Sequence, residues 1–155
     1  MSSFLIICKS IHLGNTLKVA NGMAKILECK VLEPEKVKAK DVEEAEVIGL
    51  GSGIYYGRHH NSIFKLLEKY SFKGKKVFVF YTSAFRKIKF FNDCEAKLLN
   101  ELRRHGAKII GVFECRGKSV YGPFKLLGGI CKGRPNQRDL ARAREFAEKL
   151  RKRFS

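Results

Sequence analysis

The chain has 155 residues, 45% of them hydrophobic, which is typical of one globular domain with its own core. It carries 32 Lys and Arg against 15 Asp and Glu, a formal net charge of +17 that favours anionic ligands or partners. No apolar run is long enough to cross a bilayer and no signal peptide is evident, so we expect a single cytoplasmic domain over residues 1–155.

Apolar strands alternate with amphipathic helices along the chain. Strands are predicted at residues 4–8, 29–33, 45–53, 75–82 and 108–113. Helices are predicted at residues 17–28, 62–70, 93–105 and 139–154, with residues 35–44 as a charged connection. This alternation predicts a five-stranded parallel sheet covered on both faces, in a doubly wound three-layer α/β/α sandwich.

The turn after the first strand reads KSIHLGNT over residues 9–16 and leads into a helix. Backbone N–H groups at a helix start lack intrahelical partners, so small and hydroxyl-bearing residues there are suited to hold a phosphate. The turn matches neither GxxxxGK[ST] nor GxGxxG, which argues against a P-loop triphosphatase and a dinucleotide fingerprint. An ordinary helix cap by Asn15 or Thr16 remains an alternative.

The loops after the third and fourth strands also suit a ligand, because doubly wound sheets bind ligands at the carboxyl ends of their strands. Residues 51–57 read GSGIYYG, with glycines that permit close backbone approach and two tyrosines that offer flat rings for stacking. Residues 82–85 read TSAF, with hydroxyls before an aromatic ring. Each loop alone is also compatible with an ordinary turn whose aromatic side chains pack locally.

The pattern Ser-x-x-x-Gly-Asn-Thr, formed by Ser10, Gly14, Asn15 and Thr16, resembles the phosphate loop of flavodoxins. It is one residue longer than usual, because His12 and Leu13 stand where the common pattern has a single Thr. The lead into the last helix resembles that of a subgroup of small flavodoxin-family proteins, through Gly133, Pro135, Asn136, Asp139 and Leu140. Asp139 is predicted to be the N-cap of that helix.

The resemblance implies strand order 2-1-3-4-5 and an FMN bound without a covalent link, which carries electrons between redox partners. It places Gly57 beside the flavin N5, Tyr55 or Tyr56 against the ring, and the backbone of residues 82–85 at the pyrimidine edge. The implied cofactor-binding residues are Ser10, His12, Leu13, Gly14, Asn15, Thr16, Ser52, Gly53, Ile54, Tyr55, Tyr56, Gly57, Thr82, Ser83, Ala84 and Phe85.

Two features depart from the usual flavodoxin pattern. Flavodoxins that shuttle electrons are usually acidic, whereas residues 116–155 of this chain alone hold twelve basic and three acidic residues. A basic protein is expected to meet a redox protein partner with an acidic surface. The long stretch 116–137 is predicted to be either a lid over the flavin or a docked connector.

Two other functions stay open. An FMN-dependent oxidoreductase acting on NAD(P)H, a quinone or a porphyrinogen-type substrate would also suit the long stretch and the basic surface. A basic nucleic-acid-binding domain is the remote alternative, because no nucleic-acid motif accompanies the charge.

Cysteines and histidines give weaker signals. The five cysteines contain no CxxC pair and no zinc spacing; Cys8 and Cys29 are expected to be buried and inert, and Cys115 and Cys131 could meet in space. The adjacent His59 and His60 are not expected to share a metal. Each is predicted to lie either near the flavin edge or in a surface loop.

Overall fold

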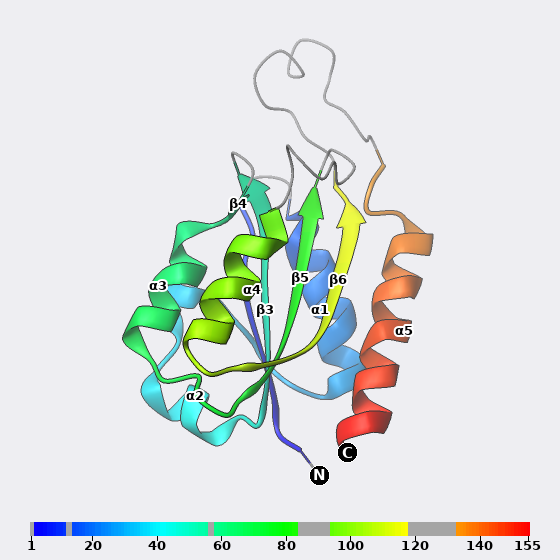
Figure 1. Cartoon of the computed structure of the whole chain (residues 1–155). Helices are drawn as coiled ribbons and strands as arrows, with labels where there is room; N and C mark the ends of the chain where they lie inside the picture. Colours follow the sequence, from blue (N-terminus) through cyan, green and yellow to red (C-terminus); the bar gives the residue numbers. More distant parts are fainter. Residues whose placement is uncertain (1, 12–13, 56–57, 84–93, 118–132) are drawn as a thin grey trace.

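The structure, a computed structural model, describes residues 2–11, 14–55, 58–83, 94–117 and 133–155 (Figure 1). Its elements in chain order are β1 (Phe4–Lys9), α1 (Asn15–Leu27), β2 (Val31–Leu32), the 3-10 turn η1 (Pro34–Lys36), α2 (Ala39–Glu44), β3 (Val47–Tyr55), β4 (Arg58–His59), α3 (Asn61–Lys69), β5 (Lys76–Ser83), α4 (Cys94–Arg104), β6 (Lys108–Arg116) and α5 (Gln137–Phe154).

The sheet has the order β2-β1-β3-β5-β6, with every neighbouring pair parallel. The two-residue strand β4 lies off this path and pairs antiparallel with β3. When β4 is set aside, this is the predicted order 2-1-3-4-5, so the doubly wound α/β fold class is confirmed. The order reverses between β1 and β3, where chain connections leave toward opposite faces of the sheet.

Two apolar clusters fill the spaces between the layers. Helices α3 and α4 cover one face of the sheet, where Ile63 and Leu98 pack with Leu50 and Val79. Helices α1 and α5 cover the other face, as Figure 1 shows, and pack on Ile6, Phe78 and Phe80. On α5, Ala143, Ala147 and Leu150 are buried and Leu140 and Phe146 are partly buried, and these residues form the inward face of the last helix.

The charged connection predicted at residues 35–44 is wrong, because it contains η1 and the short helix α2. The Asp41 carboxylate accepts a hydrogen bond from the Lys38 backbone N–H at 2.9 Å, which fixes the start of α2. Val42 is buried and anchors this helix in the core. One apolar anchor among six residues gives no helical periodicity for a sequence reading to detect.

The strand predicted at residues 45–53 is confirmed but extends further, so the part of the predicted ligand loop up to residue 55 belongs to the strand instead. Strand β3 continues to Tyr55, so Ser52, Gly53 and Ile54 are strand residues, and β4 then forms a hairpin with the end of β3. The glycine at position 51 serves packing: a Cβ there would lie 2.1 Å from the Phe80 ring on β5. Gly49 is in the same situation, 2.3 Å from the Phe78 ring. Each glycine makes room for a large ring on the neighbouring strand.

Helix α5 begins two residues before the predicted start. Its N-cap is Asn136, whose side chain accepts from the Asp139 backbone N–H at 3.0 Å, while the Asp139 carboxylate accepts from the Asn136 N–H at 2.8 Å. The prediction that Asp139 is the N-cap is therefore wrong, because Asp139 closes a capping box from the third helical position.

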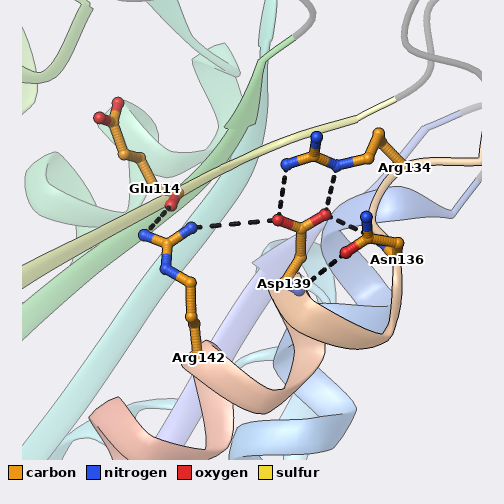
Figure 2. Close-up of polar contacts among 5 residues, drawn as sticks. All are labelled: Glu114, Arg134, Asn136, Asp139 and Arg142. Carbon is orange, nitrogen blue, oxygen red and sulfur yellow. Dashed lines mark hydrogen bonds and ion pairs between the residues drawn. The ribbon is translucent and has the colours of Figure 1, made fainter.

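Asp139 is also the centre of a buried polar cluster (Figure 2). The Arg134 guanidinium donates to both of its oxygens, at 2.6 and 2.7 Å, and Arg142 approaches to 3.9 Å. Arg142 also donates to the Glu114 carbonyl at 3.4 Å, so the cluster joins α5 to β6. Burial raises the pKa of Asp139, but the hydrogen bonds from Arg134 and the Asn136 backbone outweigh it, and the pKa lies below its usual value.

Gly51→Ala is expected to lower the free energy of unfolding by about 1–3 kcal/mol, because the added methyl group collides with the Phe80 ring. Chemical denaturation measures this. Gly22→Ala is the control: it lies within α1 with open space around it, and it is expected to stabilise by about 1 kcal/mol. In a background of Phe80→Leu the cost of Gly51→Ala should shrink, and equal costs in both backgrounds would refute the steric explanation.

Asp139→Asn is expected to lower the free energy of unfolding by about 1–3 kcal/mol at neutral pH, because Arg134 loses its charged acceptor. The folded pKa of Asp139 lies below the unfolded value of about 3.9, so this stabilisation is complete above that value and is lost as the pH falls through the folded pKa. Denaturation curves at several pH values should show the two proteins converging below about pH 4. Glu148→Gln, at an exposed carboxylate on the same helix, should change stability by less than about 0.5 kcal/mol.

Candidate functional site

The predicted phosphate turn connects β1 to α1. Gly14 is the N-cap of α1 and adopts a left-handed conformation with φ 67°, which favours glycine. Gly14 has no side chain with which to cap the helix, and the Leu17 backbone N–H donates to Ser10 Oγ at 3.3 Å. The alternative of an ordinary cap by Asn15 or Thr16 is therefore wrong, because both lie inside the helix. A helix start with glycine as its N-cap lets an anion approach the backbone N–H groups closely.

A buried hydrogen bond joins this turn to the end of β5. Thr16 Oγ1 and Thr82 Oγ1 lie 2.8 Å apart, and the two side chains are 2% and 5% exposed. Both residues are among those predicted to bind the cofactor. The bond brings together the segments that follow the first and fourth predicted strands.

The end of β6 converges on the same place. The Gly117 backbone N–H donates to the Ser83 carbonyl at 3.2 Å, and a Cβ at Gly117 would lie 2.8 Å from Asn15 Nδ2. Gly117 was not among the predicted site residues. The signal available in the sequence was a glycine directly after an apolar strand, which often marks a close approach of two backbones.

Ser52 lies at the carboxyl end of β3 and is fully buried. Its Oγ is 3.0 Å from His59 Nδ1, donates to the Gly53 carbonyl at 2.8 Å and accepts from the His60 backbone N–H at 3.1 Å. These contacts hold the two-residue strand β4 against β3.

His59 is 1% exposed, so its surface-loop alternative is wrong. Burial lowers its pKa to about 3, so the ring is neutral at physiological pH. Within the part of the chain that the structure describes, its Nε2 has no hydrogen-bond partner. His60 has a different role: its Nδ1 accepts from the Ser62 backbone N–H at 3.1 Å and caps α3.

Tyr81 is a buried polar residue that the sequence reading did not place at the site. Its hydroxyl lies 2.7 Å from Glu114 Oε2 and 3.1 Å from Glu95 Oε2, and its ring meets His59 edge-on at 5.4 Å between centroids. The period of two along β5 places Tyr81 on the same face as Val77 and Val79. That alternation was the signal that could have found it.

Several predicted residues lie outside the described residues: His12, Leu13, Tyr56, Gly57, Ala84, Phe85 and Cys131, with most of the stretch 116–137. The proposed pairing of Cys115 with Cys131 is therefore not tested. Burial raises the pKa of Cys8 and of Cys115 to about 12, and that of the half-buried Cys29 to about 11. These three thiols are protonated and unreactive at neutral pH; Cys8 is buried as expected, whereas Cys29 is only half-buried.

A groove of about 700 Å³ lies between α3 and α4, away from the phosphate turn. Arg58, Lys97 and Arg104 contribute positive charge to it, and Glu68 and Glu101 contribute negative charge. The Arg58 guanidinium stacks 4.4 Å above the Phe64 ring. Among the helices described, none has the length and apolar character needed to cross a membrane.

Comparison with known proteins agrees with this architecture. A family described as "Flavodoxin domain" matches residues 5–127. The chain is 43% identical over 148 residues to the "Uncharacterized protein MJ0298" of Methanocaldococcus jannaschii, covering 96% of this chain and 97% of that protein.

Solved structures share the fold at low sequence identity. A flavodoxin from the domain Archaea superposes with a TM-score of 0.72 at 15% identity, covering 98% of each chain. A Fusobacterium nucleatum flavodoxin bound to flavin mononucleotide superposes with a TM-score of 0.67 at 17% identity, covering both chains completely. Since the family pattern spans most of the chain and the strand order is that of the doubly wound fold, this protein belongs to the flavodoxin-domain family.

Proposed function

We propose that the protein binds FMN without a covalent link at the carboxyl edge of its sheet and carries electrons between redox partners. The observation that supports this most directly is the start of α1, which has Gly14 as its N-cap and is joined to the end of β5 by the Thr16–Thr82 hydrogen bond. Family membership supports the same proposal, as does the FMN bound in the Fusobacterium nucleatum flavodoxin.

The residues present fit a phosphate-bearing flavin. Under this proposal Ser10, Gly14, Asn15 and Thr16 bind the phosphate through hydroxyl, amide and backbone N–H donors. The backbone at the carboxyl ends of β3 and β5, from Ser52 and Thr82 onward, flanks the ring. The flavin supplies one- or two-electron transfer when bound, and the protein supplies binding, orientation and the surrounding charge.

Charge favours a partner with an acidic surface. Helix α5 carries seven basic and three acidic residues. Its first turn contains Asp139, which binds Arg134 on the side of the molecule where the proposed site lies. A positive field raises the rate of encounter with an acidic partner. A cytoplasmic location remains a prediction from the sequence.

An FMN-dependent oxidoreductase is the second candidate. The groove between α3 and α4 favours it, because Arg58 of the β3–β4 hairpin lines that groove and its charge would attract an anionic substrate. Rapid bleaching of the flavin by NAD(P)H without a protein partner would support this candidate over the electron carrier.

The first experiment is a titration of purified apoprotein with FMN and with riboflavin, followed by flavin fluorescence and the visible spectrum. Tight binding of FMN supports the proposal. If neither flavin binds, the cofactor assignment is wrong.

Asn15→Asp is expected to weaken FMN binding about tenfold or more, because a carboxylate at the helix start repels the phosphate. Binding of riboflavin, which lacks the phosphate, should be unchanged. The same substitution should stabilise the apoprotein by about 0.3–1 kcal/mol, since an acid at a helix N-terminus is favourable. Equal weakening for the two flavins would contradict the phosphate assignment.

The reduction potential for the second electron is expected to be less negative than in acidic flavodoxins, because the net charge of +17 stabilises the negative charge that reduction adds. A tenfold preference for the reduced form corresponds to about 59 mV for one electron. Raising the salt concentration from about 0.01 M to 1 M shortens the screening length from about 30 to 3 Å and should lower the potential. Spectroelectrochemistry measures this, and a potential that is independent of salt would contradict the prediction.

A further inference from the structure

The base of the β3–β4 hairpin is held by one buried hydroxyl. Ser52 Oγ takes part in three hydrogen bonds, with His59 Nδ1 at 3.0 Å, the His60 backbone N–H at 3.1 Å and the Gly53 carbonyl at 2.8 Å. The hairpin itself has only two residue pairs, Ile54 with His59 and Tyr55 with Arg58. So short a ladder is not stable alone, and side-chain contacts must hold it in place.

Counting protons identifies the arrangement that satisfies these three bonds. A serine hydroxyl has one proton to donate and two lone pairs to accept with. If the proton goes to the Gly53 carbonyl, the His60 N–H and a protonated His59 Nδ1 fill both lone pairs. The hydroxyl is then fully used, and His59 carries its proton on Nδ1.

The other nitrogen of the same ring, Nε2, has no hydrogen-bond partner among the described residues. In this tautomer His59 Nε2 is a buried, unprotonated acceptor. The ring is 1% exposed and meets Tyr81 edge-on, so water does not reach it freely. Burial also keeps the ring neutral, which preserves the Nδ1–H donor across the physiological range.

We propose that Ser52 and His59 are positioning residues, and we call their Nδ1–H···Oγ hydrogen bond a clasp. The clasp fixes β4 on β3 and thereby determines the position of the hairpin relative to the cofactor. This inference rests on the proposed binding of FMN. The clasp acts through the hairpin and not through direct contact with the flavin. Its loss is therefore expected to change both the affinity and the reduction potential of the cofactor.

Two substitutions of His59 separate the two ring nitrogens. In His59→Asn the side-chain amide takes the place of Nδ1 and can still donate to Ser52, whereas in His59→Gln the amide takes the place of Nε2 and cannot. Both remove the ring, and because Gln is one methylene group larger than Asn, packing alone predicts no greater loss in His59→Gln than in His59→Asn. Ser52→Ala removes all three hydrogen bonds of the hydroxyl.

The expected result is an FMN dissociation constant that rises about tenfold in His59→Gln and Ser52→Ala, and less than about threefold in His59→Asn. If binding of the oxidised form weakens tenfold more than that of the reduced form, the potential rises by about 59 mV for one electron. His105→Gln, in the turn directly after α4, is the matched control and should change neither quantity. Circular dichroism and thermal unfolding of each apoprotein verify that the variants fold.

The clasp also has a signature that needs no cofactor. In the apoprotein, nitrogen-15 NMR should report the Nδ1–H tautomer of His59, and the His60 amide should exchange with solvent more slowly in the wild type and His59→Asn than in Ser52→Ala. The opposite tautomer, or an unprotected His60 amide in the wild type, would overturn the clasp.

The remaining outcomes are also decisive. Equal effects of His59→Asn and His59→Gln on FMN binding would show that only ring packing matters, and a loss confined to His59→Asn would transfer the role to Nε2. Either result overturns the proposal. Failure of the wild type to bind FMN would instead overturn the proposed function, while the tautomer and amide exchange would still decide whether the clasp exists.

Discussion

The reversal of strand order between β1 and β3 is the constraint on which the rest of this structure depends. Because the chain moves from β1 to β2 in one direction across the sheet and from β3 to β5 in the other, right-handed connections place α1 on one face and α3 on the other. The carboxyl ends of β1, β3 and β5 then lie side by side, and the segments that follow them meet at one edge. Residues far apart in the sequence, such as Thr16 and Thr82, become hydrogen-bond partners only because of this geometry.

Two buried, hydrogen-bonded pairs of polar side chains fix the structure of this edge, one pair on each face of the sheet. The Thr16–Thr82 pair lies on the α1 side, and the Ser52–His59 pair lies on the α3 and α4 side. All four side chains are neutral, so their burial does not carry the cost of desolvating a charge. Apolar residues would fill the same space, but they would leave buried backbone groups such as the His60 N–H without an acceptor.

The fold was predictable because its strongest signals are local. Buried parallel strands are continuous apolar runs, and residues 76–83 are such a run, whereas α2 was missed because Val42 is its one buried anchor. The start of α5 was misplaced because Asn136 and Asp139 cap each other at a spacing of three, and either alone could pass for the N-cap. The alternation along residues 76–83 places Tyr81 on the same face as Val77 and Val79, but the burial of His59 depends on its pairing with β3, which no local pattern contains.

The positive charge of the chain and the hydrogen-bond donors of the phosphate turn lie in different places, and this determines how an anion would be bound. The chain has a net charge of +17, whereas the described part of the phosphate turn contains no basic side chain after Lys9. Lys9 itself is engaged by Glu35 at 2.9 Å. A phosphate here would therefore be bound by backbone N–H groups and hydroxyls, with the surface charge acting from a distance. Short-range donors then determine where the anion sits, and the long-range field, which salt screens, determines how strongly the whole region favours negative charge.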